Sequence, residues 1–333
     1  MLPDFDDRGI AINDKQIIIN ASYFVKHDGY MQRTQALIHC LFNLRNQLKS
    51  KDLVFFLYDG EPIQISGFEY TIKKICTMLQ IPENKIILSI IDHQPKIDFG
   101  QIRQISRHSG FFEQVKNLLK VDLCKLDPDY RLFGAFFGRF TLHRLLMAHY
   151  LATNHQDSSI VSFRPDYRLA EFEIDPFAKY FASHLDWLKS RLGMNPTLTA
   201  DQASRNLSTY HEVFGKYAIE IVIETNIIDT GWFTEKTAKC LASGKPFILL
   251  GTQGQLAKLR EMGFKTFSDD INESYDNEHC HEIRFEMICQ QIAKLDGLDA
   301  TAKTQLVKRL NSVSEYNKNN YHTLVNKYYA TPL

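Results

Sequence analysis

The first third of the chain alternates short apolar runs with stretches in which apolar residues recur at helical spacing. Continuous apolar runs of about five residues are typical of buried strands, and apolar residues three and four positions apart predict amphipathic helices. Strands are predicted at 17–21, 53–58 and 86–91, and helices at 31–49 and 68–79. Because strands that are apolar on both faces belong to sheets covered on both sides, this alternation predicts a parallel α/β domain.

The alternation starts again after a less regular stretch, 92–129, which contains one weak helix pattern at 111–119. Further strands are predicted at 132–137, 159–163, 218–224 and 246–251, and further helices at 141–153, 177–192, 234–243, 253–262, 282–295 and 301–329. We therefore expect one α/β domain over residues 1–128 and a second over 129–300. The last segment, 301–333, is expected to form a helix that packs across both domains.

Length and charge narrow the classes of protein to which the chain can belong. Its 333 residues exceed the roughly 250–300 at which one core usually divides, which agrees with two domains. The 39 basic residues are matched by 39 acidic ones, which argues against nucleic acid as a partner. No apolar stretch approaches the ~18 residues of a transmembrane segment, so we expect a cytoplasmic protein and leave peripheral membrane contact open. The six cysteines form no CxxC pair, which favours reduced thiols.

The most informative segment runs from the predicted strand at 218–224 into the next helix. The strand ends at Glu224, Thr234 stands where a helix N-cap belongs, and Glu235 and Lys236 follow in the first turn. Free N–H groups and a lysine at such a turn favour a phosphate, and a carboxylate there can accept both hydroxyls of a ribose. The alternative is purely structural, with a capping threonine, a carboxylate that complements the helix dipole and a solvated lysine.

A second basic element follows the strand at 132–137. Arg139 stands at the strand end, Thr141 can cap the next helix, and Arg144 lies in its first turn. The helix dipole disfavours a cation there, so an anionic ligand would explain the arginine, whose planar fork suits phosphate oxygens. The alternative is a surface arginine paired with a carboxylate.

The run FTEKTAKCLASGKPFILLG, residues 233–251, with the strand before it, resembles the donor-binding region of α-1,3-fucosyltransferases and related GT-B glycosyltransferases. The resemblance implies two Rossmann-like domains that face each other across a cleft, followed by C-terminal helices. It also implies a nucleotide-sugar donor, for which the family favours a GDP-sugar, and a glycan or glycoconjugate acceptor. The transfer it implies is inverting and uses no metal or other cofactor. By position, Glu235 would bind the ribose and Lys236 a phosphate. The other expected donor-binding residues are Arg139, Arg144, Thr234 and Glu224.

A similar pattern of glycosyltransferase-like proteins continues through Tyr275, Asp276 and Arg284. For Tyr275 and Asp276 the alternative is a turn in which Asp276 caps the helix that follows. The run His279-Cys280-His281 lacks the paired spacing of a zinc site, so no metal is expected.

Inverting transfer needs a base that takes the proton of the acceptor hydroxyl. Asp59 and Glu61, beside Gly60 after the second strand, are the leading candidates; the pairs His27-Asp28 and Asp92-His93 end other strands. Each of these residues also suits a turn. Two other functions stay open on the sequence alone: a non-catalytic module that binds a nucleotide or glycan, and a sugar-nucleotide epimerase.

Overall fold

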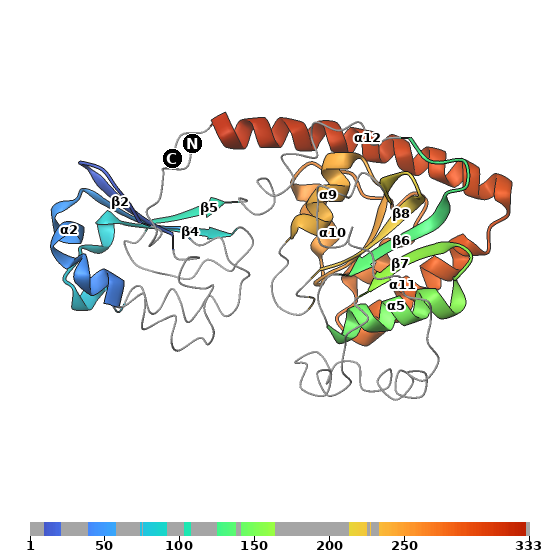
Figure 1. Cartoon of the computed structure of the whole chain (residues 1–333), viewed down its shortest axis with the longest axis horizontal. Helices are drawn as coiled ribbons and strands as arrows, with labels where there is room; N and C mark the ends of the chain where they lie inside the picture. Colours follow the sequence, from blue (N-terminus) through green and yellow to red (C-terminus); the bar gives the residue numbers. More distant parts are fainter. Residues whose placement is uncertain are drawn as a thin grey trace. The chain divides into compact units, whose positions relative to one another are not determined.

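The computed structural model describes residues 10–20, 39–57, 74, 76–91, 103–107, 125–137, 141–163, 213–224, 227 and 233–330 (Figure 1). The chain divides into two compact units between Gly110 and Phe111, with the last residues, 331–333, assigned to the first unit. Each unit has its own cluster of buried apolar side chains. The division falls earlier in the chain than the predicted boundary between 128 and 129, within the stretch that the hydrophobic pattern left irregular.

The first unit contains a sheet in the order β1-β2-β3-β4-β5. The short strand β1 (Ile10–Ile12) is antiparallel to β2 (Gln16–Asn20), and β3 (Leu53–Leu57), β4 (Ile86–Ile91) and β5 (Arg103–Arg107) continue in parallel. The predicted strands β2, β3 and β4 are confirmed, whereas β1 and β5 were not predicted. Helix α2 (Arg45–Ser50) and the 3₁₀ turn η2 (Glu83–Lys85) also belong to this unit, and residues 39–43 and 76–78 are helical as well. The four parallel strands, β2 to β5, lie side by side in chain order, so the described part of this sheet contains no reversal of strand order.

The second unit contains a parallel sheet in the order β7-β6-β8-β9. Its strands are β6 (Arg131–Phe137), β7 (Ser159–Phe163), β8 (Tyr217–Ile223) and β9 (Phe247–Leu250). All four were predicted, and their ends lie within one residue of the predicted bounds. The chain goes from β6 outward to β7, then returns to the other side of β6, where β8 and β9 follow. The strand order therefore reverses between β6 and β8, and in open α/β sheets ligands bind at the carboxyl ends of the strands at such a point.

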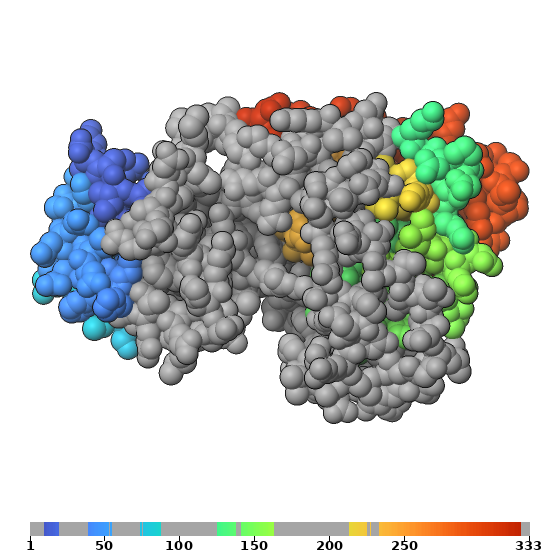
Figure 2. Space-filling model, in the orientation of Figure 1, coloured from blue at the N-terminus to red at the C-terminus, as the bar shows by residue number. Residues whose placement is uncertain are grey.

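Helices cover both faces of this second sheet. Helices α9 (Glu235–Ser243) and α12 (Ala300–Ala330) pack together on one face, and α5 (Leu142–Asn154) and α11 (His281–Asp296) lie on the other (Figure 1). The short helix α10 (Gln255–Glu261) contacts the 3₁₀ turn η6 (Glu273–Asn277). Helix α12 buries a stripe at helical spacing that joins the core of the second unit; its buried apolar members are Leu306, Val307, Leu310, Tyr321 and Val325. Other residues of α12 reach the surface of the face drawn in Figure 2.

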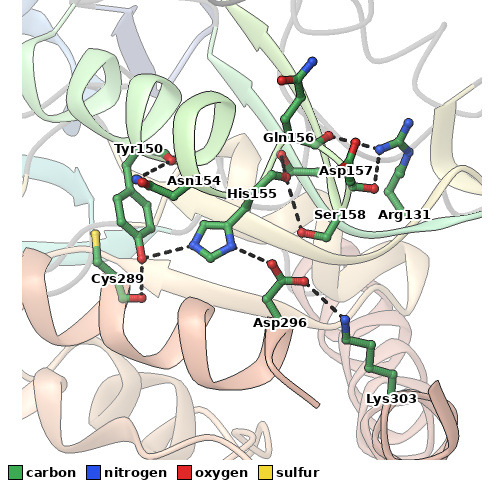
Figure 3. Close-up of polar contacts among 11 residues, drawn as sticks. Arg131, Tyr150, Asn154, His155, Gln156, Asp157, Ser158, Cys289, Asp296 and Lys303 are labelled. Carbon is green, nitrogen blue, oxygen red and sulfur yellow. Dashed lines mark hydrogen bonds and ion pairs between the residues drawn. The ribbon is translucent and has the colours of Figure 1, made fainter. Parts of the chain in front are cut away.

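At the amino end of β7 a polar network joins α5 to the last two helices (Figure 3). His155 Nδ1 lies 2.7 Å from Asp296 Oδ2, and Lys303 Nζ donates to the other oxygen of Asp296 at 3.2 Å. The hydroxyl of Tyr150 donates to the carbonyl oxygen of Cys289 at 2.9 Å and lies 3.1 Å from His155 Nε2. The network fixes the carboxyl end of α5 near the amino ends of the strands. The amino end of α5 is thereby held near the carboxyl ends of the strands.

Candidate functional site

Two helices begin where the strand order of the second sheet reverses. Helix α5 starts after β6 and helix α9 starts after β8, and β6 and β8 are neighbours in the sheet. This arrangement brings together five of the predicted donor-binding residues, which we call the switch-point cluster: Arg144, Glu224, Thr234, Glu235 and Lys236.

Glu224 is fully buried and holds the start of α9. Its carboxylate accepts hydrogen bonds from the backbone N–H of Thr234 at 3.1 Å and from the hydroxyls of Thr234 and Thr237, both at 2.5 Å. Both carboxylate oxygens are therefore engaged by the first turn of α9. In this structure Glu224 anchors a helix, whereas the sequence predicted a contact with the donor.

The first turn of α9 satisfies much of its own hydrogen bonding. Thr234 is the N-cap, as predicted, and its hydroxyl oxygen accepts the backbone N–H of Lys236 at 3.2 Å. Lys236 Nζ donates to the same oxygen at 3.2 Å and to Glu235 Oε1 at 2.7 Å. The backbone N–H groups of Thr234 and Lys236 are therefore already bonded within the protein and do not await a phosphate.

The charged side chains of the cluster shift one another's pKa values. Burial and the positive charge of Arg144 lower the pKa of Lys236, although Glu235 and Glu224 oppose this change. Burial would raise the pKa of Glu235, but Lys236 and, more weakly, Arg144 outweigh burial, so the pKa of Glu235 is lowered. Two cations thus act on each other across the ends of α5 and α9, an arrangement that an added anion would relieve.

Arg144 lies deeper than a first-turn surface arginine would. Its side chain is fully buried, and one guanidinium nitrogen donates to the carbonyl oxygen of Ile223, the last residue of β8, at 3.1 Å. The neighbouring His143 is also fully buried, and burial, with the charge of Arg144, lowers its pKa from 6.5 to about 3. A neutral ring that lies 3.3 Å from the carbonyl oxygen of Glu224 must donate through Nε2. The start of α5 is thus attached to the end of β8 by two side chains.

Two buried residues organise the neighbouring loops. Asp276 accepts hydrogen bonds from the backbone N–H groups of Leu256 and Ala257 at 2.9 and 3.1 Å, so it caps α10. The alternative from the sequence, in which Asp276 caps the helix that follows it, is therefore wrong. Arg284 donates to the carbonyl oxygens of Ile227, Gly251 and Glu278, which join the segments after β8 and β9 to the start of α11. Sequence reasoning did not assign this role to Arg284, because its partners are main-chain atoms that leave no signal in the sequence.

Several predicted site residues lie outside the described residues. They are Arg139 among the donor-binding candidates, Asp59 and Glu61 as candidate bases, and the pairs His27-Asp28 and Asp92-His93. The predicted helices at 111–119 and 177–192 lie outside them as well. The cluster that the structure defines is consequently the donor side of the predicted site.

Other features of the described ranges lie apart from the switch-point cluster. Within them, no three His, Cys, Asp or Glu side chains come close enough to hold a metal ion, and the cysteines Cys40, Cys76, Cys240, Cys280 and Cys289 are free thiols. None of the helices between residues 10 and 330 that are described is both long and apolar enough to cross a membrane. A hollow of about 270 Å³ lies beside α12, but its lining, which includes Asp270 and Arg309, shares no residue with the switch-point cluster.

The chain was compared with models of known families, with curated proteins and with solved structures, and none of these comparisons gives a significant match.

Proposed function

We propose that the chain is a GT-B glycosyltransferase that transfers a sugar from a nucleoside-diphosphate sugar to a glycan or another hydroxyl acceptor. The observation that carries this proposal is the meeting of Arg144 and Lys236 at the reversal of strand order, where α/β proteins bind ligands. A confined pair of cations suits a diphosphate, whose charge grows as the sugar leaves. The donor is assigned to the second unit and the acceptor to the first, as two Rossmann-like domains of the GT-B form would require.

The Glu235–Lys236 ion pair gives this proposal its ligand chemistry. Both partners are partly exposed, with 35% of the Glu235 side chain and 18% of the Lys236 side chain accessible. A nucleoside diphosphate can replace both partners at once, since its phosphate takes the place of the carboxylate and its ribose hydroxyls take the place of the ammonium. Inorganic phosphate would satisfy Lys236 and leave Glu235 without its cation, so we expect it to bind less tightly.

In the proposed reaction an acceptor oxygen attacks the anomeric carbon of the donor sugar. The bond between that carbon and the β-phosphate oxygen breaks, the nucleoside diphosphate leaves, and a carboxylate takes the acceptor proton. Asp59 and Glu61 remain the candidates for this base. Lys236 would contact the leaving diphosphate, and Arg144, buried behind the turn, would contribute through its charge.

The test is the affinity of a panel of nucleoside diphosphates, measured by calorimetry on the full chain and on Lys236→Ala. Loss of a charged hydrogen bond costs about 1.5–3 kcal/mol, so affinity should fall roughly 10- to 100-fold. Lys308→Ala is the matched control, because Lys308 is an exposed lysine on α12 of the same unit. Equal affinity in wild type and Lys236→Ala would refute the site.

Turnover separates the proposed enzyme from its rivals. A glycosyltransferase should release nucleoside diphosphate from the correct nucleotide sugar, slowly with water and faster with an acceptor. Binding without release would favour a non-catalytic module, and conversion of the sugar without release would favour an epimerase.

A further inference from the structure

Two buried glutamates, Glu220 within β8 and Glu224 directly after it, both face α9. Glu220 and Glu224 are four residues apart, and residues at even spacing on a strand lie on the same face of the sheet. Glu220 is 2% exposed and pairs with Lys239 of α9 at 2.7 Å, whereas Glu224 is 0% exposed and is held by hydroxyls and a backbone N–H. Burying a carboxylate is costly, and an apolar residue would serve packing as well, so the second carboxylate calls for another reason.

The direction of the hydrogen bonds supplies that reason. A carboxylate only accepts, so the hydroxyl proton of Thr234 points to Glu224 and the lone pairs of that hydroxyl point away from it. Those lone pairs accept the backbone N–H and the Nζ of Lys236. Glu224 therefore orients Thr234, and Thr234 in turn orients the ammonium of Lys236.

The same residue ties this turn to the rest of the sheet. The backbone N–H of Glu224 donates to Leu250 of β9 at 3.0 Å, and its carbonyl oxygen accepts from His143 of α5 at 3.3 Å. Glu224, directly after β8, therefore connects the start of α9 to β9 and α5.

We propose that Glu224 is a positioning residue of the switch-point cluster: it does not bind the ligand, but it sets the place of Lys236 through Thr234 and supports the ammonium by its own negative charge. The inference rests on the proposed function for the identity of the ligand, while its effect on Lys236 can be measured without any ligand.

The charge of Lys236 responds to three described groups on the elements around it. Burial and Arg144 of α5 lower its pKa, while Glu235 of α9 and Glu224, directly after β8, raise it. Removing the charge of Glu224 should therefore lower the pKa of Lys236 further. Since the ammonium is the form that attracts phosphate, Lys236 should lose its proton, and the site its affinity, at a lower pH than in the wild type.

The experiment compares Glu224→Gln with Glu220→Gln. Both variants neutralise a buried glutamate opposite α9, one within β8 and one directly after it, but Glu220 faces Lys239 instead of Lys236. Titration of lysine side chains by ¹³C/¹⁵N NMR on the full chain, with Lys236→Arg to assign the resonance, reports the ionisation of Lys236 directly. We expect its midpoint to move to lower pH in Glu224→Gln and to stay in place in Glu220→Gln. An unchanged midpoint in Glu224→Gln, or an equal shift in both variants, would overturn the proposal.

Nucleoside diphosphate affinity, measured across the same pH range, distinguishes this inference from the proposed function. If the wild type binds no nucleoside diphosphate while the Lys236 midpoint moves as expected, the proposed function fails and the positioning role stands. If the wild type binds and the midpoint does not move, the positioning role fails alone.

A second variant covers the case in which Glu224→Gln does not fold. Thr237→Val keeps the charge and removes one of the three hydrogen bonds to the carboxylate. The proposal expects faster amide hydrogen exchange in the first turn of α9 and unchanged exchange in its last turn. Unchanged exchange at both ends would count against an anchoring role.

Discussion

Replacing Lys239 by methionine should destabilise the second unit by about 3–5 kcal/mol, because it leaves the buried carboxylate of Glu220 without its facing cation. The two charged atoms are 2.7 Å apart, and at an effective dielectric constant of about 20 their attraction is roughly 6 kcal/mol. Burial would lower the pKa of Lys239, yet Glu220 outweighs burial and raises it, which shows the direction of the coupling. The pair as a whole should contribute little, since moving both charges out of water costs about as much as their attraction returns.

Hydrogen exchange of β8 amides, followed by mass spectrometry on the full chain, measures this loss without requiring both units to unfold together. The double variant Lys239→Met/Glu220→Gln removes both charges and keeps an acceptor for the hydroxyl of Tyr217, which donates to Glu220 at 2.8 Å. It should recover to within about 1 kcal/mol of the wild type. A single variant that loses less than about 1 kcal/mol, or a double variant as unstable as the single one, would refute the reasoning.

Three other predictions test the packing around the site. In Gly134→Ala the new Cβ would lie 2.5 Å from two ring carbons of Tyr217, so thermal unfolding should show a loss of about 1–3 kcal/mol. Asp276→Ala removes two hydrogen bonds at the start of α10; it should cost about 2 kcal/mol and speed amide exchange there but not in α11. Burial would raise the pKa of Asp296, but hydrogen bonds, with that from His155 the largest, lower it. A lowered folded pKa stabilises the fold above the unfolded value, so the stability lost in Asp296→Asn should be full near neutral pH and shrink as pH falls below about 4.

Local patterns in the sequence predict most of the secondary structure. Each of the apolar runs that become β2, β3, β4 and β6 to β9 was predicted to within one residue at either end. The strands that escaped prediction are β1, with three residues, and β5, whose sequence RQISR begins and ends with arginine. Both lie at the edges of the described part of the first sheet, where a strand has one described neighbour and need not be apolar throughout.

Contacts between distant residues could not be predicted in the same way. The N-cap at Thr234 was predictable because a cap depends on its own helix, and the structure confirms it. The partners of Asp276 and Arg284 depend on which loops meet in space, and the reversal of strand order between β6 and β8 depends on how the sheet assembles. Neither leaves a periodic signal, so the sequence predicted the residues of the cluster better than their roles.

The proposed site would select an anion although the charges of its cluster are balanced. Arg144 and Lys236 are matched by Glu224 and Glu235, but the two carboxylates differ in what a ligand can do to them. Glu224 is fully buried and occupied by three hydrogen bonds, so its charge is already compensated in place by the start of α9. Glu235 is about one-third exposed, so a phosphate that takes its place beside Lys236 would leave its carboxylate to face the ribose hydroxyls. Arg144 cannot follow, because it is buried and bound to the carbonyl oxygen of Ile223. Replacing the Glu235 carboxylate would therefore leave both cations acting on the ligand, as the proposed binding of a diphosphate at this turn requires.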